Sequence, residues 1–217
     1  MITLQQPGLV VFDMDSTLIT IECIDELADL VGKKAEVSAV TEAAMRGELD
    51  FAESLRARVQ LLTGVERSKL AELFQPLPLS VGALQLIEWF HQHGWRAALV
   101  SGGFTWFSEQ VAQALALDAH HANTLLWQGD KLTGEVAEPI VDAHYKATYL
   151  QQLAEQWDIP LHNTIAVGDG ANDSAMLAVA GLGVAYCAKP ALREVADVCL
   201  DTPDLMQLAH HLQALEK

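Results

Sequence analysis

The chain has 217 residues, of which 51% are hydrophobic and 19% are charged, so it is long and apolar enough to bury a full core. Its formal net charge at neutral pH is −16. Nucleic acids and anionic membranes bind basic surfaces, so this charge argues against both as partners. A small anionic substrate is compatible with it, provided that the counter-charge is local: a metal ion or a few well-placed basic side chains.

The cysteines Cys23, Cys187 and Cys199 are scattered and odd in number, which is typical of reduced thiols and not of a disulfide framework. The first residues, MITLQQPG, contain neither a basic segment nor an apolar segment, and they predict no signal peptide. The longest uncharged apolar stretch, 174–188, is shorter than a membrane-spanning helix and is interrupted by glycines. We therefore expect a cytoplasmic protein.

The predicted elements start with a strand at 9–15, where four apolar residues run directly into a pair of acids. Residues 20–80 then carry helical patterns and no strand pattern, with helices expected at 24–31, 35–46, 50–62 and 66–74. The third of these helices has a clear start, because Asp50 and Glu53 have the spacing of a capping box. We expect residues 20–80 to form a helical cap that is inserted after the first strand.

From residue 81 onward, helical and strand patterns alternate. Helices are expected at 82–93, 104–116, 143–157, 172–180 and 204–215, strands at 97–103 and 164–170, and a small hairpin at 126–136. The strand runs are continuously apolar, which is typical of parallel strands covered on both faces. The pattern predicts a doubly wound parallel α/β sheet, with a core of residues 1–19 and 81–217 and a cap of residues 20–80.

Three predicted strands end in a polar residue: Asp13, Ser101 and Asp169. Ligands of open parallel sheets bind beyond the carboxyl ends of the strands, so we expect these residues to meet. Asp15 lies two positions after Asp13 and would face the same side, unless it only caps the following turn. Clustered acids are costly unless a hard cation neutralises them, and Mg²⁺ is the cation that prefers such ligands.

Such a cluster is suited to phosphoryl transfer, in which one aspartate attacks phosphorus and a second one moves the proton. Ser101 lacks the glycine of a nucleophile elbow, since position 99 is Leu. It is either a turn serine or, with the N–H of Gly102, a donor to a phosphate oxygen. Lys146 shares a helical face with apolar residues, so it either extends to water or supplies a fixed positive charge to the site.

One face of the helix predicted at 50–62 carries Phe51, Leu55 and Arg58, whereas Arg56 points away from it. An arginine within an apolar stripe that faces a cleft needs an anion, and its planar fork matches a carboxylate. The alternative is an arginine at the rim of the core.

Together, DMDST at 13–17, VSGG at 100–103, Lys146 and GDGAND at 168–173 resemble the four ordered motifs of the haloacid dehalogenase superfamily of phosphatases and phosphotransferases. Further segments, among them IECIDELADLVG, TEAAMRGELDF, SLRARV, GDKLTG and AYCAKP, resemble the members of this superfamily that hydrolyse phosphoserine. The resemblance covers nearly the whole chain and implies the core fold of that superfamily, a Rossmann-like sheet, with a small helical cap.

The resemblance also implies a role for each matching position. Asp13 would be the nucleophile and Asp15 the general acid and base. Mg²⁺ would be held by the Asp13 side chain, the backbone carbonyl of Asp15 and Asp169, with Asp173 behind them. The expected substrate contacts are Ser101, Gly102 and Lys146 at the phosphoryl group, Asn172 beside it, Glu22 at the ammonium, Arg58 at the carboxylate, and Met45 and Phe51 as an apolar lid.

The activity implied is the Mg²⁺-dependent hydrolysis of O-phospho-L-serine to L-serine and phosphate through an aspartyl-phosphate, a step of L-serine biosynthesis. The alternatives are a phosphotransferase, a phosphatase for another small amino-alcohol phosphate, and a non-catalytic module that binds Mg²⁺ and a phosphorylated metabolite. A binding module has no use for a proton-transferring Asp15 beside a nucleophile. The expected partner is therefore a small phosphorylated amino acid. The sequence does not indicate whether the protein is a monomer or an oligomer.

Overall fold

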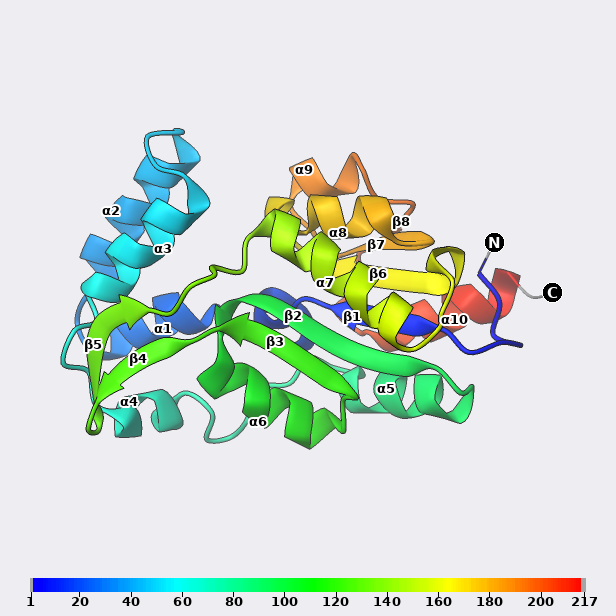
Figure 1. The fold of residues 1–217 in the computed structure, drawn as a ribbon, viewed down its shortest axis with the longest axis horizontal. Coiled ribbons are helices and arrows are strands. Elements are labelled where there is room, and N and C mark those ends of the chain that lie inside the picture. The colour runs from blue at the N-terminus through cyan, green and yellow to red at the C-terminus, as the bar shows by residue number, and fades with distance from the viewer. Residues whose placement is uncertain (1, 216–217) are drawn as a thin grey trace.

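A six-stranded parallel sheet forms the centre of the computed structural model, which describes residues 2–215 (Figure 1). Its strands lie in the order β3-β2-β1-β6-β7-β8. They are β1 (Leu9–Phe12), β2 (Arg96–Phe104), β3 (Ala119–Asn123), β6 (Thr164–Gly168), β7 (Leu182–Tyr186) and β8 (Val198–Leu200). The chain winds outward in one direction from β1 and in the other from β6, so the switch point of the sheet lies between these two strands.

Two layers of helices cover the sheet, because alternate residues of each strand point to opposite faces. Val10 and Phe12 pack in one apolar cluster with α5, α6 and α10, whereas Leu9 and Val11 pack in another with α7, α8 and α9. These helices are α5 (Ala83–Gln92), α6 (Thr105–Leu115), α7 (Ala143–Gln156), α8 (Ser174–Val179), α9 (Pro190–Arg193) and α10 (Met206–Leu215). The doubly wound α/β fold predicted from the sequence is confirmed.

Four further helices lie beyond the carboxyl ends of the strands (Figure 1). They are α1 (Cys23–Leu30), α2 (Lys34–Met45), α3 (Phe51–Gln60) and α4 (Arg67–Glu72), and short turns are η1 (Met14–Leu18), η2 (Leu161–Asn163) and η3 (Ala171–Asp173). The capping box predicted for α3 is present, since Asp50 and Glu53 exchange backbone-to-side-chain hydrogen bonds. The two connections to the core run side by side, with an isolated bridge between Ile19 and Leu79.

The hairpin of β4 (Leu125–Gln128) and β5 (Lys131–Val136) lies with these helices, although it follows a core strand in the chain (Figure 1). Backbone hydrogen bonds join it to the α3–α4 connection: Gly64 N–H donates to Leu132 O at 2.8 Å, and Leu132 N–H donates to Val65 O at 2.9 Å. Arg67 also stacks over the Trp127 ring. The division into core and cap at residues 20–80 stays a prediction, and a cap that moved would carry the hairpin with it.

The sequence analysis did not predict strands β3, β7 and β8. The edge strand β3 contains two adjacent histidines, and β7 follows a glycine in a segment that reads equally as a loop. Strand β3 lacks the long apolar run of a central parallel strand, and β7, although it lies in the apolar stretch 174–188, is short and contains Gly183. Among the described residues, none of the helices has both the length and the apolar character that crossing a membrane requires.

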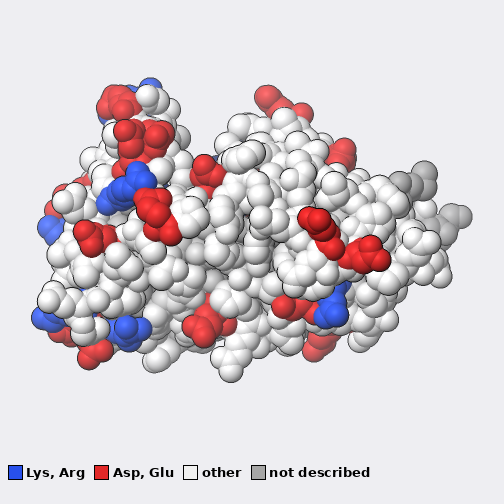
Figure 2. Space-filling view, in the orientation of Figure 1, with Lys and Arg blue, Asp and Glu red and all other residues white. Residues whose placement is uncertain are grey.

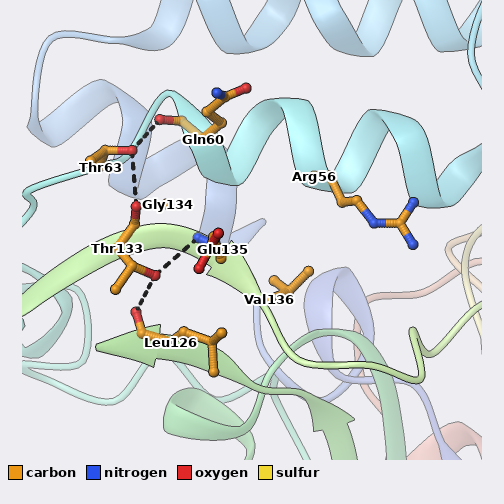
Figure 3. Close-up of a pocket in the computed structure, with 8 residues that line it drawn as sticks. All are labelled: Arg56, Gln60, Thr63, Leu126, Thr133, Gly134, Glu135 and Val136. Atoms are coloured by element: carbon orange, nitrogen blue, oxygen red, sulfur yellow. Dashed lines mark hydrogen bonds between the residues drawn. The ribbon is translucent and has the colours of Figure 1, made fainter. Parts of the chain in front are cut away.

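Gly134 lies where the hairpin meets α3, and the Thr63 hydroxyl there donates to the carbonyl of Gln60 (Figure 3). The φ angle of Gly134 is +87°, and a Cβ atom at this position would collide with the Thr63 side chain. Gly129, in the turn of the same hairpin, also has a positive φ, but a Cβ there would meet open space. Substitution of either glycine strains the backbone, but only substitution of Gly134 also creates a steric clash. Comparing the two positions therefore isolates the cost of the clash.

We expect Gly134→Ala to lower the free energy of unfolding by about 1–3 kcal/mol more than Gly129→Ala. Both substitutions place an L-residue in the left-handed region, and only the first adds a collision with the cap. Urea denaturation of the two variants measures the difference. Equal losses would mean that the hairpin does not pack against α3 as described.

Candidate active site

Asp13 follows β1 directly and lies at the switch point of the sheet. Its N–H donates to the carbonyl of Val167 at 2.9 Å, so the backbone still follows the ladder to β6. Its carboxylate is buried, and Oδ1 accepts the Met14 N–H at 2.7 Å. Backbone pairing and this hydrogen bond fix the side chain at the carboxyl end of the strand, where an open parallel sheet binds ligands.

Lys146 approaches Asp13 from the first half of α7. Asp142 caps that helix by accepting the Tyr145 N–H, which sets where the helix starts. The ammonium of Lys146 lies 2.8 Å from Asp13 Oδ1 and 2.7 Å from Asp173 Oδ1, and the side chain is 1% exposed. The alternative that Lys146 extends to water is therefore wrong. Burial lowers the pKa of Lys146, but the two carboxylates outweigh it and hold the pKa above its usual range.

Asp169 and Asp173 come from the segment that follows β6. Asp173 Oδ2 accepts the N–H groups of Asp169 and Gly170, both at 3.2 Å, and its Oδ1 contacts Lys146. Gly168 is required here, because a Cβ on it would collide with the Asp173 carboxylate. Both oxygens of Asp173 are thus engaged within the protein, whereas the Asp169 carboxylate has only long contacts, from the Thr17 hydroxyl at 3.5 Å and the Lys189 ammonium at 3.8 Å.

These carboxylates form a cluster with the composition of a metal site. Ligand atoms of Asp13, Asp169 and Asp173 lie within 4.8 Å of one another. Burial, reinforced by Asp173, raises the pKa of Asp13 and raises the pKa of Asp169 to about 6. The single positive charge of Lys146 neutralises only part of the negative charge of the three carboxylates, and no other buried cation of the described residues pairs with them. A hard cation with oxygen ligands fits this donor set.

Asp15 lies between this cluster and the start of α1. Its Oδ2 accepts the Cys23 N–H at 3.2 Å, and its Oδ1 is a buried oxygen without a hydrogen-bond partner among the described residues. Burial and the nearby Glu22 raise the pKa of Asp15 to about 7. The expectation that Asp15 merely caps a turn does not account for an orphaned oxygen, which costs free energy unless a ligand pairs with it.

Strand β2 continues through Ser101 and the two following glycines to Phe104, and its register against β3 shifts after Ser101. The Ser101 Oγ accepts the Gly103 N–H at 2.9 Å, so its own proton remains available to an acceptor in the site. Asn123 supports this irregular end of β2 from the end of β3: its amide donates to the Gly102 carbonyl at 2.9 Å, and its oxygen accepts the Val141 N–H at 2.8 Å. The sequence prediction missed Asn123 because it missed β3.

The predicted cap residues lie at different distances from the core. Phe51 is close to Gly102, since a Cβ on that glycine would be 3.0 Å from the Phe51 ring. Glu22 accepts the Ser16 hydroxyl at 2.7 Å beside Asp15. Met45, in contrast, is 84% exposed at the end of α2, so the structure does not bring it to the other residues.

Arg56 and Arg58 lie on different faces of α3 and differ in burial, as the helical spacing predicts. Arg58 is half-buried, its Nε donates to the Ser54 carbonyl at 3.3 Å, and burial lowers its pKa against the opposing effect of the nearby acids Asp25 and Glu22. Arg56 is exposed and pairs with Glu138 at 2.6 Å, and it lines a pocket between α3 and the hairpin (Figure 3).

Two further residues lie at the Asp169 side of the site. Asn172 is half-buried in η3, next to Asp173. The sequence analysis did not identify Lys189 as a site residue. Its N–H donates to the Asp169 carbonyl at 2.9 Å, and its ammonium is 3.8 Å from Asp169 Oδ2. On the visible face of the molecule, a notch separates the cap helices from the side of the core that carries α8 and α9 (Figure 2).

Comparison with known proteins agrees with this geometry. The family model for haloacid dehalogenase-like hydrolase matches residues 10–178. The phosphoserine phosphatase of Idiomarina loihiensis is 54% identical over 96% of this chain and 95% of its own. The phosphoserine phosphatase of Vibrio cholerae is 50% identical over 91% of this chain, which spans 60% of that longer protein.

A solved structure described as a phospho-aspartyl intermediate analogue of phosphoserine phosphatase has a TM-score of 0.89 and 39% sequence identity. The match covers 95% of this chain and 99% of that one. These similarities cover both the core strands and the cap, so the resemblance drawn from the four motifs is confirmed. The chain therefore belongs to the haloacid dehalogenase-like hydrolase family, among its phosphoserine phosphatases.

Proposed function

We propose that the chain hydrolyses O-phospho-L-serine to L-serine and phosphate in a Mg²⁺-dependent reaction, with Asp13 as the phosphorylated nucleophile. The observation that carries the proposal is the buried contact between Asp13 and Lys146, 2.8 Å long, at the switch point of the sheet. The similarity to phosphoserine phosphatases over nearly the full chain supports the choice of substrate.

Asp13 is held in the position that an attacking group needs. Its Oδ1 is fixed by the Met14 N–H and by Lys146, so Oδ2 is the oxygen that attacks phosphorus. A P–O bond forms to Asp13 as the P–O bond to the serine oxygen breaks. Water then attacks the same phosphorus and releases phosphate, which regenerates the Asp13 carboxylate.

Asp15 supplies and recovers the proton of these two steps. With a pKa near 7 it holds a proton at neutral pH and can still lose it, which suits a group that acts first as an acid and then as a base. It donates its proton to the leaving serine oxygen and later accepts one from the hydrolytic water. Its unpaired Oδ1 is the atom we assign to this exchange.

The phosphoryl group is bound by charge and by short donors. Lys146 supplies a fixed positive charge, and Ser101, the Gly102 N–H and Asn172 are assigned to its oxygens. Mg²⁺, held by the Asp13 side chain, the Asp15 backbone carbonyl and Asp169, supplies electrostatic neutralisation of phosphate oxygens when bound. Asp173 positions Lys146 and the Asp169 backbone, since both of its oxygens are already used.

The cap recognises the rest of the molecule. We assign the substrate ammonium to Glu22, which lies beside Asp15, and the substrate carboxylate to the half-buried Arg58. Phe51 closes over Gly102 as part of an apolar lid. Met45 belongs to that lid only if the end of α2 moves toward the core, so its role stays a prediction.

We place this reaction in the cytoplasm and in L-serine biosynthesis. The free thiols of Cys23, Cys187 and Cys199 support a reducing compartment. The proposed partner is one small phosphorylated amino acid, and the net charge of −16 disfavours nucleic acid.

Asp13→Asn should abolish phosphate release from phosphoserine while leaving the unfolding midpoint close to that of the wild type, because an amide does not attack phosphorus. Asp15→Asn should lower kcat by about 10²–10⁴-fold through lost proton transfer. Steady-state phosphate release under saturating Mg²⁺ measures both variants. Near wild-type turnover of Asp13→Asn would contradict the covalent mechanism.

Mg²⁺ should stabilise the protein more at about pH 8 than at about pH 5. The pKa of Asp169 is raised to about 6, so the folded state binds more protons than the unfolded chain, and folding stability falls as pH rises from about 4 toward that pKa. Mg²⁺ needs the deprotonated carboxylate, so it offsets this loss only at the higher pH. At a hundredfold excess over its Kd, a bound ligand adds about 2.7 kcal/mol.

Thermal unfolding in EDTA and in Mg²⁺ at both pH values measures this difference. Asp169→Asn should lose the Mg²⁺ response, whereas the exposed Asp130→Asn should keep it. The same Mg²⁺ response in Asp169→Asn as in the wild type would rule out the assigned ligand.

Arg58→Ala should lower kcat/KM on phosphoserine by one to two decades, since a lost charge-assisted hydrogen bond costs about 1.5–3 kcal/mol. The loss should be much smaller on phosphoethanolamine, which has the ammonium but no carboxylate. Glu22→Gln should show the opposite pattern, with harm to amino substrates and little effect on phosphoglycolate. Arg56→Ala is the matched control, and it should leave the ratio of the two substrates unchanged. Equal losses on both substrates for Arg58→Ala would assign Arg58 to packing or to the phosphate.

A further inference from the structure

Lys189 brings a second ammonium group to the acid cluster. It follows β7 and immediately precedes α9, whose first residue is Pro190. Its backbone N–H donates to the Asp169 carbonyl at 2.9 Å, and its Nζ lies 3.8 Å from Asp169 Oδ2. Two separate contacts therefore tie this lysine to Asp169: its N–H binds the backbone carbonyl of Asp169, and its ammonium lies near the carboxylate.

The two lysines of the site differ in environment. Lys146 is buried and is fixed between Asp13 and Asp173, whereas the Lys189 side chain is 69% exposed. In the part of the chain that the structure describes, these are the lysines within ion-pair distance of the clustered acids. The neighbouring Arg193 of α9 pairs instead with Asp201, away from the cluster.

The position of Lys189 has opposite consequences for the two ions that the site must bind. A positive charge beside Asp169 attracts a phosphate dianion and repels a divalent cation. The protein as a whole has a charge of −16, so it repels an anionic substrate at long range, and a local ammonium at the edge of the site offsets this repulsion. Two unit charges about 4 Å apart in water interact by about 1 kcal/mol, which corresponds to roughly a fivefold change in affinity.

We propose that Lys189 is a substrate-attracting residue at the rim of the active site, which increases the capture of the phosphate group and lowers the affinity of the site for Mg²⁺. The inference rests on the proposed function, because it takes Asp169 as a holder of the cation and a phosphomonoester as the substrate. The lysine is a positioning and capture residue, and bond making and breaking stay with Asp13 and Asp15.

The test compares Lys189→Met with Arg193→Met, which removes the same charge from α9. Mg²⁺ binding to the enzyme without substrate is measured by titration calorimetry, and kcat/KM for phosphoserine is measured at saturating Mg²⁺. Lys189→Met should bind Mg²⁺ two- to fivefold more tightly and lose a factor of about two to five in kcat/KM. Lys189→Arg should retain both wild-type values, and Arg193→Met should change neither.

Salt supplies an independent readout that a merely structural role would not move. At about 1 M salt the Debye length is about 3 Å, so both differences between Lys189→Met and the wild type should disappear. Mg²⁺ affinity and kcat/KM that fall together, or that both stay unchanged at low salt, would overturn the proposal. Failure of the proposed function is distinguishable from this, because the wild type itself would then release no phosphate from phosphoserine in Mg²⁺.

Discussion

The buried ion contact of Lys146 with Asp13 and Asp173 is the interaction on which the rest of the site depends. Removing charges from water costs several kcal/mol per ion, and the arrangement persists only where partners and hydrogen bonds compensate it. Here Met14 N–H binds Asp13, and two backbone N–H groups bind Asp173. Lys146 thus links strand β1, helix α7 and the segment after β6 through one ammonium group. In the proposed mechanism catalysis uses the same group, because the charge that stabilises the cluster would also attract a phosphoryl group.

The topology of the sheet explains why these groups meet. Strands β1 and β6 are neighbours at the switch point, so the residues that follow them emerge at one edge with their side chains toward a common space. The cap lies over that edge, and Phe51 from α3 reaches Gly102. The hairpin of β4 and β5 joins the cap by backbone hydrogen bonds although it continues directly into the linker before α7. A movement of helices α1–α4 would therefore act, through the hairpin, on the linker that leads into α7, the helix that carries Lys146.

Sequence reasoning reached Asp13 and Asp169 because continuous apolar strands are recognisable and parallel strands present their carboxyl ends together. It reached Lys146 because a lysine in an apolar helical stripe is unusual, but only the structure distinguished the buried charge from an extended one. The sequence pattern did not identify Asn123 or Lys189. Asn123 ends the strand β3, which has a weak strand pattern, and Lys189 lies in a loop whose position depends on tertiary packing. The attachment of the hairpin to the cap was also hidden, because backbone pairing between 64–67 and 130–132 leaves no periodic pattern in the side chains.

In the proposed mechanism Asp13, held by Lys146, receives the phosphoryl group. The most direct measurement is to quench the enzyme with acid during turnover of phosphoserine that carries a labelled phosphate, and to map the labelled peptide by mass spectrometry. We expect a phosphate on Asp13 in the peptide that contains the DMDST motif, and a much smaller trapped amount in Lys146→Met. A label on another residue, or rapid turnover without any covalent phosphate, would contradict it.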